Sequence, residues 1–325
     1  MINMKDWRKN IQFDSFPKFL SAQNKAIIYF TRRDLLNEKV NSIEKLWKSP
    51  ILLKVIDKQQ VDGSWKYPSS KKDIRTQENY NQLETYRQLG FLIEKYGFNR
   101  QHQAIQKAAE FLFSFQTEEG DFRGIYGNQY SPNYTAGIME LLIKAGYEKD
   151  SRIEKGFKWL LSVRQDDGGW AVPIRSNNAK WSDVENSDEV LQPNKKKPFS
   201  HMITGVVLRA FAAHPKFRSL EDAKIAGELL ASRFFKLDKY PDRKAVDYWF
   251  RVSFPFWFTD IVSSLDTLSN LGFTPSHPQI EMALNTLRDR QLENGLWDLK
   301  LLKTKDKDLP LWIALAICRI FKNIY

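Results

Sequence analysis

Two kinds of hydrophobic pattern alternate along the chain. Segments such as 134–145, 203–213 and 261–271 are apolar on nearly all sides, which predicts helices that are buried all round. The predicted inner helices cover 21–37, 76–96, 132–146, 200–214, 257–272 and 308–324. Between them, apolar residues recur on one face only, as Ile153, Phe157, Leu160 and Leu161 do, which predicts amphipathic outer helices. These cover 42–58, 99–116, 149–164, 219–235 and 277–291.

A short loop motif recurs at the ends of the outer helices. Each copy has Gln, two or three further residues, Gly, one residue, and then Trp or Phe. The four copies are Gln60, Gly63 and Trp65; Gln116, Gly120 and Phe122; Gln165, Gly168 and Trp170; and Gln291, Gly295 and Trp297. We expect the Gly to allow a tight turn and the aromatic ring to pack on a neighbouring helix. Recurrence of this kind indicates a repeat architecture.

A second marker has the same phase. The pairs Gly97-Phe98, Gly146-Tyr147 and Gly272-Phe273 each begin 19 residues before a motif Gln. A Gly that closes a helix adopts positive φ, and the next aromatic residue packs back on the last turn. The following outer helices are predicted to begin with capping boxes, formed by Ser151 with Glu154, Ser219 with Asp222, and Ser276 with Gln279. The copy between the third and the last has lost both markers.

Strand signals are sparse, so the sequence predicts an all-α fold of paired inner and outer helices. Six inner and at least five outer helices favour a closed ring, a single (α/α)6-type toroid, and an open solenoid is the alternative. The segment 5–20 is the candidate for the missing outer helix. We therefore expect an N-terminal extension over 1–20 and one toroid domain over 21–325.

Composition narrows the classes of protein. The chain has 325 residues, a net charge of +11 and an aromatic content of 14%. The basic excess fits a lysine-rich solvated surface, since no nucleic-acid motif accompanies the cluster at 195–197, and we expect no nucleic-acid partner. No apolar run is long enough for a transmembrane helix, and residues 1–10 lack an apolar signal core. The single Cys318 excludes a disulfide framework. We expect a cytoplasmic protein; peripheral membrane contact and the oligomeric state stay open.

The four motif copies resemble the QW motifs of squalene–hopene and oxidosqualene cyclases, whose α/α toroid is shared by protein prenyltransferase β subunits. The resemblance covers about residues 21–325. It implies a toroid in which the motif residues tie the outer helices together, and an apolar isoprenoid ligand in the central cavity.

The catalytic signatures of that superfamily are missing. The chain has no Asp-x-Asp-Asp motif, which supplies the proton in class II cyclases, and no Asp-Asp-x-x-Asp motif, which binds diphosphate through magnesium. Cys318 lies in an apolar helix without Asp or His close by in sequence, unlike the zinc ligand of prenyltransferases. We therefore predict neither a metal nor a cofactor, and the sequence leaves open whether the protein is an enzyme.

Candidate site residues lie where the inner helices begin, because these ends follow the motif loops and would converge at one mouth of a toroid. They are Glu78, Tyr80, Asn133, Tyr134, His201, Trp257 and Asp260. Asp260 and His201 are the candidates for catalysis. The alternative for His201 is a helix cap or a surface position, and the alternative for Asp260 is a carboxylate that complements the helix dipole at the start of its helix. The aromatic stretch 248–258 replaces the lost motif copy, and it serves either as packing or as a cation-stabilising lining. The polar loop 171–199 is either a lid or disordered.

The functional hypothesis is an isoprenoid- or terpenoid-handling toroid, with cyclase- or prenyltransferase-like activity as its catalytic form. One alternative is a non-catalytic scaffold that recognises a peptide or a partner protein. A second is glycan processing, which unrelated α/α toroids perform and which needs paired carboxylates.

Overall fold

The computed structural model describes residues 7–68, 76–184, 187, 189–241, 245–302 and 305–325. The chain divides into two compact units, one formed by residues 1–46 with 227–325 and the other by residues 47–226. Both are helical, and the strands in the described part are the two-residue pieces β1 (Arg251–Val252) and β2 (Lys300–Leu301), which pair in parallel. The all-α fold class is therefore confirmed, while the division into an extension and one toroid domain stays a prediction.

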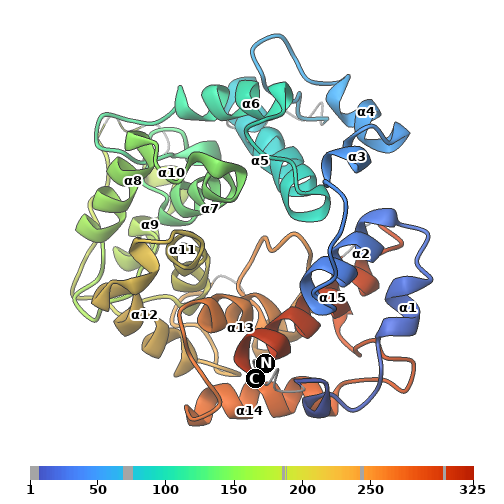
Figure 1. Ribbon diagram of the computed structural model, residues 1–325. Coiled ribbons are helices and arrows are strands. Elements are labelled where there is room, and N and C mark those ends of the chain that lie inside the picture. Colours follow the sequence, from blue (N-terminus) through green and yellow to red (C-terminus); the bar gives the residue numbers. More distant parts are fainter. Residues whose placement is uncertain (1–6, 69–75, 185–186, 188, 242–244, 303–304) are drawn as a thin grey trace. The chain divides into compact units, whose positions relative to one another are not determined.

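The unit of residues 47–226 has two layers of helices (Figure 1). The inner layer consists of α5 (Gln77–Tyr96), α7 (Pro132–Leu142) continued by η4 (Ile143–Tyr147), and α11 (His201–Ala213). The outer layer contains α4 (Pro50–Ile56), α6 (Gln103–Phe113) and α8 (Ser151–Ser162). Short helices lie in the connections: η3 (Gly124–Tyr126), α9 (Pro173–Ser176), α10 (Trp181–Val184) and η5 (Phe217–Ser219).

The other unit repeats this pairing. Its inner helices are α2 (Lys25–Phe30) continued by η2 (Thr31–Leu35), α13 (Ile261–Asn270) and α15 (Leu309–Ile324), and α14 (Pro278–Asp289) is an outer helix. The remaining helices are η1 (Trp7–Asn10), α1 (Phe16–Leu20) and η6 (Val246–Phe250). Two outer helices, α3 (Glu44–Trp47) and α12 (Glu221–Ala231), cross the boundary between the units. Every predicted inner and outer segment therefore contains helix, although Pro50 divides the first outer one.

The predicted capping boxes of the outer helices are wrong. Helix α8 is capped by Asp150, one residue before Ser151, through the backbone N–H of Arg152. Helix α14 begins after His277, because Pro278 is suited to the first helical position. The His277 side chain makes no cap hydrogen bond. The glycine markers are confirmed, since Gly97, Gly146 and Gly272 all have positive φ.

In the first two motif copies, a glutamine ties the loop to the start of the next outer helix. Gln116 Nε2 donates to the carbonyls of Gly120 and Arg152, at 2.8 Å each. In the first copy the residue that does this is Gln59, not Gln60, and it donates to Gly63 and Ala104. Gln60 is exposed and accepts a hydrogen bond from Ser64. Sequence spacing alone does not show which of the adjacent amides, Gln59 or Gln60, points at the loop.

The motif aromatic residues bind their own repeat and the next inner helix. The indoles of Trp65, Trp170 and Trp297 donate to the carbonyls of Val55, Leu160 and Leu287, each ten residues back at the end of the preceding outer helix. The backbone N–H groups of Trp65, Phe122 and Trp170 donate to the hydroxyls of Thr85, Thr135 and Thr204 on the inner helix that follows. The first and third loops thus fix an outer helix against the next inner one.

The glycines of the first two motif copies lie close to the backbone of the next outer helix. At Gly63, with φ of +90°, an added Cβ would lie 2.3 Å from the carbonyl oxygen of Lys107. At Gly120, with φ of +109°, it would lie 2.7 Å from that of Lys155. Both conformation and space therefore require Gly at these turns.

The N-terminal segment takes the place of the next outer helix at the last motif copy. Gln291 accepts from the N–H groups of Gln12 and Phe13 and donates to the carbonyl of Phe13. Ser15 donates in turn to the carbonyl of Gly295 at 2.6 Å. The role expected for the segment 5–20 is thus visible in its described part, residues 7–20.

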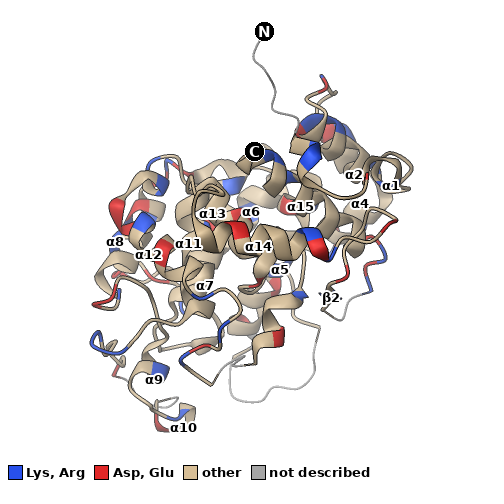
Figure 2. Cartoon of the chain, turned by 90° about the horizontal axis from the view of Figure 1, so that it is seen from below, with Lys and Arg blue, Asp and Glu red and all other residues tan. Residues whose placement is uncertain are grey.

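Charged residues of both signs are interspersed along the helices (Figure 2). Among the described residues, no helix is both long and apolar enough to cross a membrane.

Candidate functional site

The inner helices of the 47–226 unit begin with hydroxyl caps that follow the motif loops. Thr76 accepts a hydrogen bond from Asn79, Ser131 from Tyr134, and Ser200 from Ile203, in each case from the backbone N–H. Such caps satisfy N–H groups that have no partner within the helix. Because equivalent loops precede α5, α7 and α11, their N-terminal ends form one comparable set of positions in this unit.

Aromatic side chains gather at the ends of α5 and α7. The rings of Tyr67 and Tyr80 lie 5.0 Å apart. Tyr126 of η3 makes edge contacts with Tyr134 at 5.8 Å and with Trp181 at 5.4 Å. All five side chains are half-buried. We call them the aromatic rim, and their exposed faces offer apolar and cation-attracting surface.

Gly124 holds the rim together. Its φ is +57°, and an added Cβ would lie 2.5 Å from Cδ1 of Tyr134. Three residues further along, a Cβ on Gly127 would lie 3.5 Å from the side-chain nitrogen of Asn79 on α5. Space in the turn 124–127 therefore requires Gly at position 124, next to α7, whereas a Cβ at position 127 would make an ordinary contact with α5.

The segment 171–199, here called the strap, is folded where the structure describes it (171–184, 187 and 189–199). Val172, Ile174 and Val184 form a small core, against which Trp181, Leu191 and Ile203 of α11 also pack. At its far end, the carbonyls of Asn194 and Lys197 accept from Gln165 Nε2. Disorder of the described part is thereby excluded, and α9 and α10 lie beyond one end of the helical layers (Figure 2).

One buried amide holds the strap to the second motif loop. Gln129 is 1% exposed; its Nε2 donates to the carbonyls of Val184 and Glu189, and its Oε1 accepts from the N–H of Leu191. The neighbouring Asn128 side chain donates to the carbonyl of Ser187. The strap is thus fixed beside the aromatic rim, to which it contributes Trp181.

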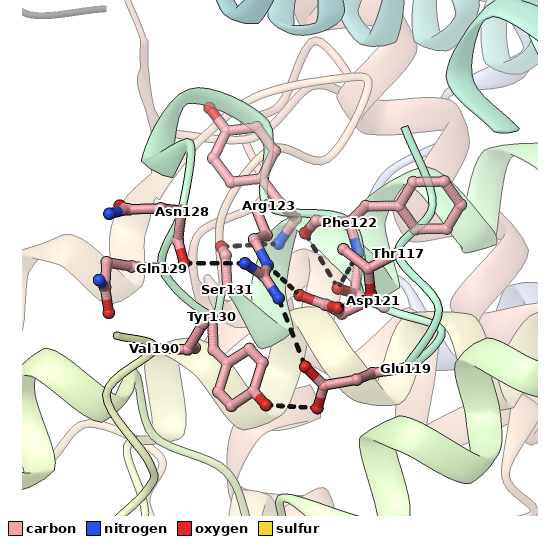
Figure 3. Close-up of polar contacts among 12 residues, drawn as sticks. Thr117, Glu119, Asp121, Phe122, Arg123, Asn128, Gln129, Tyr130, Ser131 and Val190 are labelled. Atoms are coloured by element: carbon pink, nitrogen blue, oxygen red, sulfur yellow. Dashed lines mark hydrogen bonds and ion pairs between the residues drawn. The ribbon is translucent and has the colours of Figure 1, made fainter. Parts of the chain in front are cut away.

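The loop that carries Gln129 is itself braced by Arg123 (Figure 3). Its guanidinium donates to Asp121 at 3.0 Å, to the carbonyl of Asn128 at 2.9 Å and to Glu119 at 3.4 Å. Glu119 also accepts from the Tyr130 hydroxyl, and burial together with this hydrogen bond raises the pKa of Tyr130. These groups satisfy one another, which marks them as the frame of the loop.

A buried ion network crosses the inner layer, and the sequence analysis missed it. Glu140 of α7 is 3% exposed and lies 2.9 Å from Nε of Arg209 on α11, which is equally buried. Lys144 bridges Glu140 at 2.8 Å and Glu94 of α5 at 2.6 Å. The signal was present, since Glu140 and Arg209 are charges within otherwise apolar stretches, but the stretches were interpreted as apolar all round.

The ion network determines the protonation states of Glu140 and Tyr86. Burial alone would raise the pKa of Glu140, but Arg209 and Lys144 outweigh it and hold the pKa below its ordinary value. Burial raises the pKa of Tyr86, whose charged neighbours are the same groups, to about 12. Near neutral pH Glu140 is therefore a carboxylate and Tyr86 a phenol.

Five of the predicted site residues lie at the inner-helix ends of this unit. Tyr80 and Tyr134 are in the aromatic rim, and Asn133 accepts a hydrogen bond from Ser131. Glu78 is exposed on the first turn of α5, whereas His201, the first residue of α11, is 3% exposed. Their grouping follows from the repeat, but their contact with a ligand stays a prediction.

The other two predicted residues lie in the other unit, at the start of α13. Asp260 is 1% exposed and forms a capping box, in which its carboxylate accepts from the N–H of Ser263 and the Ser263 hydroxyl accepts from the N–H of Asp260. The half-buried Trp257 donates its N–H to the Ser253 hydroxyl. Asp260 thus caps the start of its helix, the position that the alternative to catalysis gives it.

Comparison with known proteins finds similarity over part of the chain. Residues 81–190 match the squalene–hopene cyclase C-terminal domain. A terpene cyclase–glycosyl transferase fusion protein of Humicola fuscoatra is 30% identical over 103 residues, which are 31% of this chain. The match spans only 8% of that relative's length.

Matches among solved structures have lower sequence identity. The type II terpene cyclase MstE from Scytonema is 12% identical over 83% of this chain and 95% of its own, with a TM-score of 0.36. In complex with geranylgeranyl dihydroxybenzoate, MstE covers 91% of this chain and 98% of its own at 13% identity and a TM-score of 0.37. A protein from Actinoplanes is 13% identical over 83% of this chain and 96% of its own, with a TM-score of 0.31.

Proposed function

We propose, on the premise that residues 81–190 belong to the terpenoid cyclase-like superfamily, that the protein binds an isoprenoid chain against the aromatic rim. The observation that carries the proposal is a coincidence of position. Tyr126, whose ring contacts those of Tyr134 and Trp181, lies with both of them within the matched segment. Isoprenoid chains are apolar and rich in double bonds, so the half-exposed aromatic rings give them a complementary surface.

The strap supports this function. It places Trp181 against Tyr126, and Gln129 fixes it there through three hydrogen bonds. A bound chain would be covered on this side by the strap and would exclude water from the rings, which is where most of the binding free energy of an apolar ligand arises.

The charged groups favour binding over acid-initiated cyclisation. Protonation of an alkene needs a carboxylic acid that still carries its proton. Glu140 is held as a carboxylate by two cations, and Asp260 accepts a backbone hydrogen bond as the cap of α13. Glu140 is therefore not suited to donate a proton, and Asp260 has a structural role as a cap, so we propose an isoprenoid-binding role without this chemistry.

Calorimetric titration of the full chain with geranylgeraniol, geranylgeranyl diphosphate and squalene tests the proposal. Each ring contact contributes about 0.5–1.5 kcal/mol, so the double variant Tyr126→Leu/Trp181→Leu should weaken binding about 5- to 100-fold. Tyr325→Leu, a change at the chain end, is the matched control and should bind like the wild type.

Three outcomes would contradict the proposal. If none of the three ligands binds the wild type, the proposed isoprenoid binding is refuted. If Tyr325→Leu loses as much affinity as Tyr126→Leu/Trp181→Leu, the aromatic rim is not the binding site. A cyclised product, detected by mass spectrometry after incubation, refutes the non-catalytic role.

A further inference from the structure

The repeat that lost its loop motif keeps one of the motif's hydrogen bonds at a longer spacing. Trp249 is buried, and its indole donates to the carbonyl of Lys236, 13 residues back, at 3.0 Å. The intact copies span ten residues with the same bond. The chain between Lys236 and Trp249 is therefore longer than a tight motif turn requires, and part of it forms a different surface.

That surface contains a wide-open, shallow cleft of about 540 Å³. Its apolar wall consists of Phe235, Leu237 and Val246. Leu237 and Val246 are 45% and 39% exposed, although both are large aliphatic side chains. Exposed apolar side chains grouped along a cleft indicate a surface that a ligand covers.

The same cleft is basic. Arg233, Lys236 and Lys239 line it, together with one acidic residue, Asp238. Asp238 is 3% exposed and accepts a hydrogen bond from the N–H of Tyr240, while Lys236 and Lys239 are exposed. The solvent-facing charge of the cleft is therefore positive and suits an anionic group.

Backbone strain shapes the apolar wall. Phe235 has a φ of +60°, which is rare for a residue with a bulky side chain. The rings of Phe235 and Phe250 are nearly parallel, with their centroids 5.4 Å apart and an interplanar angle of 9°. The guanidinium of Arg290 lies 4.0 Å from the centroid of the Phe250 ring. Strain of this kind persists where the surroundings enforce it, and it is concentrated at functional sites.

From this combination we infer a second binding site, for an amphiphile with an anionic head and an apolar chain. Lys239 and Lys236, whose ammonium also donates to the carbonyl of Ser232, supply positive charge for the head, and Phe235, Leu237 and Val246 receive the first carbons of the chain. The site is separate from the aromatic rim, since its residues belong to the other unit, and it does not depend on the proposed isoprenoid binding.

Calorimetric titration with dodecyl phosphate below its micellar concentration tests the inference, with dodecanol and inorganic phosphate as single-feature probes. We expect dodecyl phosphate to bind at least ten-fold more tightly than either, and more weakly at high salt. Lys239→Glu should weaken binding about three- to ten-fold, and Leu237→Ser about three-fold. The matched controls are the exposed Lys18→Glu and Met282→Ser in the same unit, which should leave affinity unchanged.

The inference is overturned if dodecyl phosphate does not bind, or if dodecanol binds as tightly. It also fails if the two cleft variants bind like their controls while circular dichroism shows all four to be folded. Binding to vesicles with anionic lipids without binding of the monomeric amphiphile would replace a ligand site with a membrane-contacting surface, and would equally refute it.

Discussion

The ion network of the inner layer allows a quantitative test of how α5, α7 and α11 are held together. Glu140→Gln removes one negative charge and keeps the shape of the side chain. Arg209, at 3% exposure, then loses its carboxylate partner and stays buried as a cation. Removing one partner of a buried ion pair costs about 3–5 kcal/mol, so we expect the free energy of unfolding to fall by about 3 kcal/mol.

Two further variants separate this effect from general damage. Glu94→Gln removes the other carboxylate bound by Lys144, but Lys144 keeps Glu140 and its side chain is 29% exposed, so the cost should stay below about 1 kcal/mol. The double variant Glu140→Leu/Arg209→Leu replaces both charges with apolar side chains. Such exchanges are often nearly neutral, and we expect it within about 1–2 kcal/mol of the wild type.

Urea unfolding followed by circular dichroism measures the overall free energy, and hydrogen exchange of the α7 and α11 amides measures the local one. The local measurement is needed because a chain with two compact units need not unfold in a single step. The reasoning is refuted if Glu140→Gln and Glu94→Gln cost the same, or if the double variant is less stable than Glu140→Gln.

The remaining predictions concern pH, the first motif loop, the strap and the aromatic rim. The pKa of Glu140 is lowered from 4.5 on folding, so the stability that its charge contributes is complete above the unfolded-state pKa and is lost as the pH falls through the folded-state pKa. The stability difference between wild type and Glu140→Gln should therefore shrink below about pH 4.5, which urea unfolding measures. Gln59→Leu should cost about 1–3 kcal/mol in the same assay because two carbonyls lose their donor, whereas Gln60→Leu should cost under 1 kcal/mol, and equal costs would contradict the assignment. Gln129→Ala should accelerate hydrogen exchange in the strap without affecting α13, and unchanged strap exchange would show that the amide does not hold it. Gly124→Ala should weaken geranylgeraniol binding by displacing Tyr134, whereas Gly272→Ala, also at positive φ but with nothing within 4 Å of the added Cβ, should cost about 1 kcal/mol of stability and leave binding intact.

The helices and their order could be predicted from sequence because two independent markers share one phase. Helix α5 was expected over 76–96 and covers Gln77–Tyr96, since Thr76 caps its start and Gly97 closes its end. Boundaries were wrong where two candidate caps stand side by side. Asp150 and Ser151 are both good N-caps, and only the backbone conformation of Asp150, which is extended, decides between them. The same ambiguity placed the motif amide at Gln60 instead of Gln59.

The candidate site could be predicted only as far as the repeat determines it. Tyr80 and Tyr134 follow from the rule that inner helices begin after motif loops, so their place at helix starts could be inferred from sequence. Trp181 could not, because it reaches Tyr126 through the strap, which has no counterpart in the other repeats.

The ion network was missed for a different reason. Glu140 and Arg209 become partners only because α7 packs on α11, and within each helix the charge is a single exception in an apolar stretch. A lone buried charge is costly, so a charged residue in an all-apolar helix predicts a partner on a neighbouring helix even when the sequence does not identify it. Applied to this chain, that rule gives Glu140 in α7 and Arg209 in α11, which are opposite in sign and lie on consecutive inner helices. The ion pair could thus have been proposed from sequence once the inner helices were known to be neighbours.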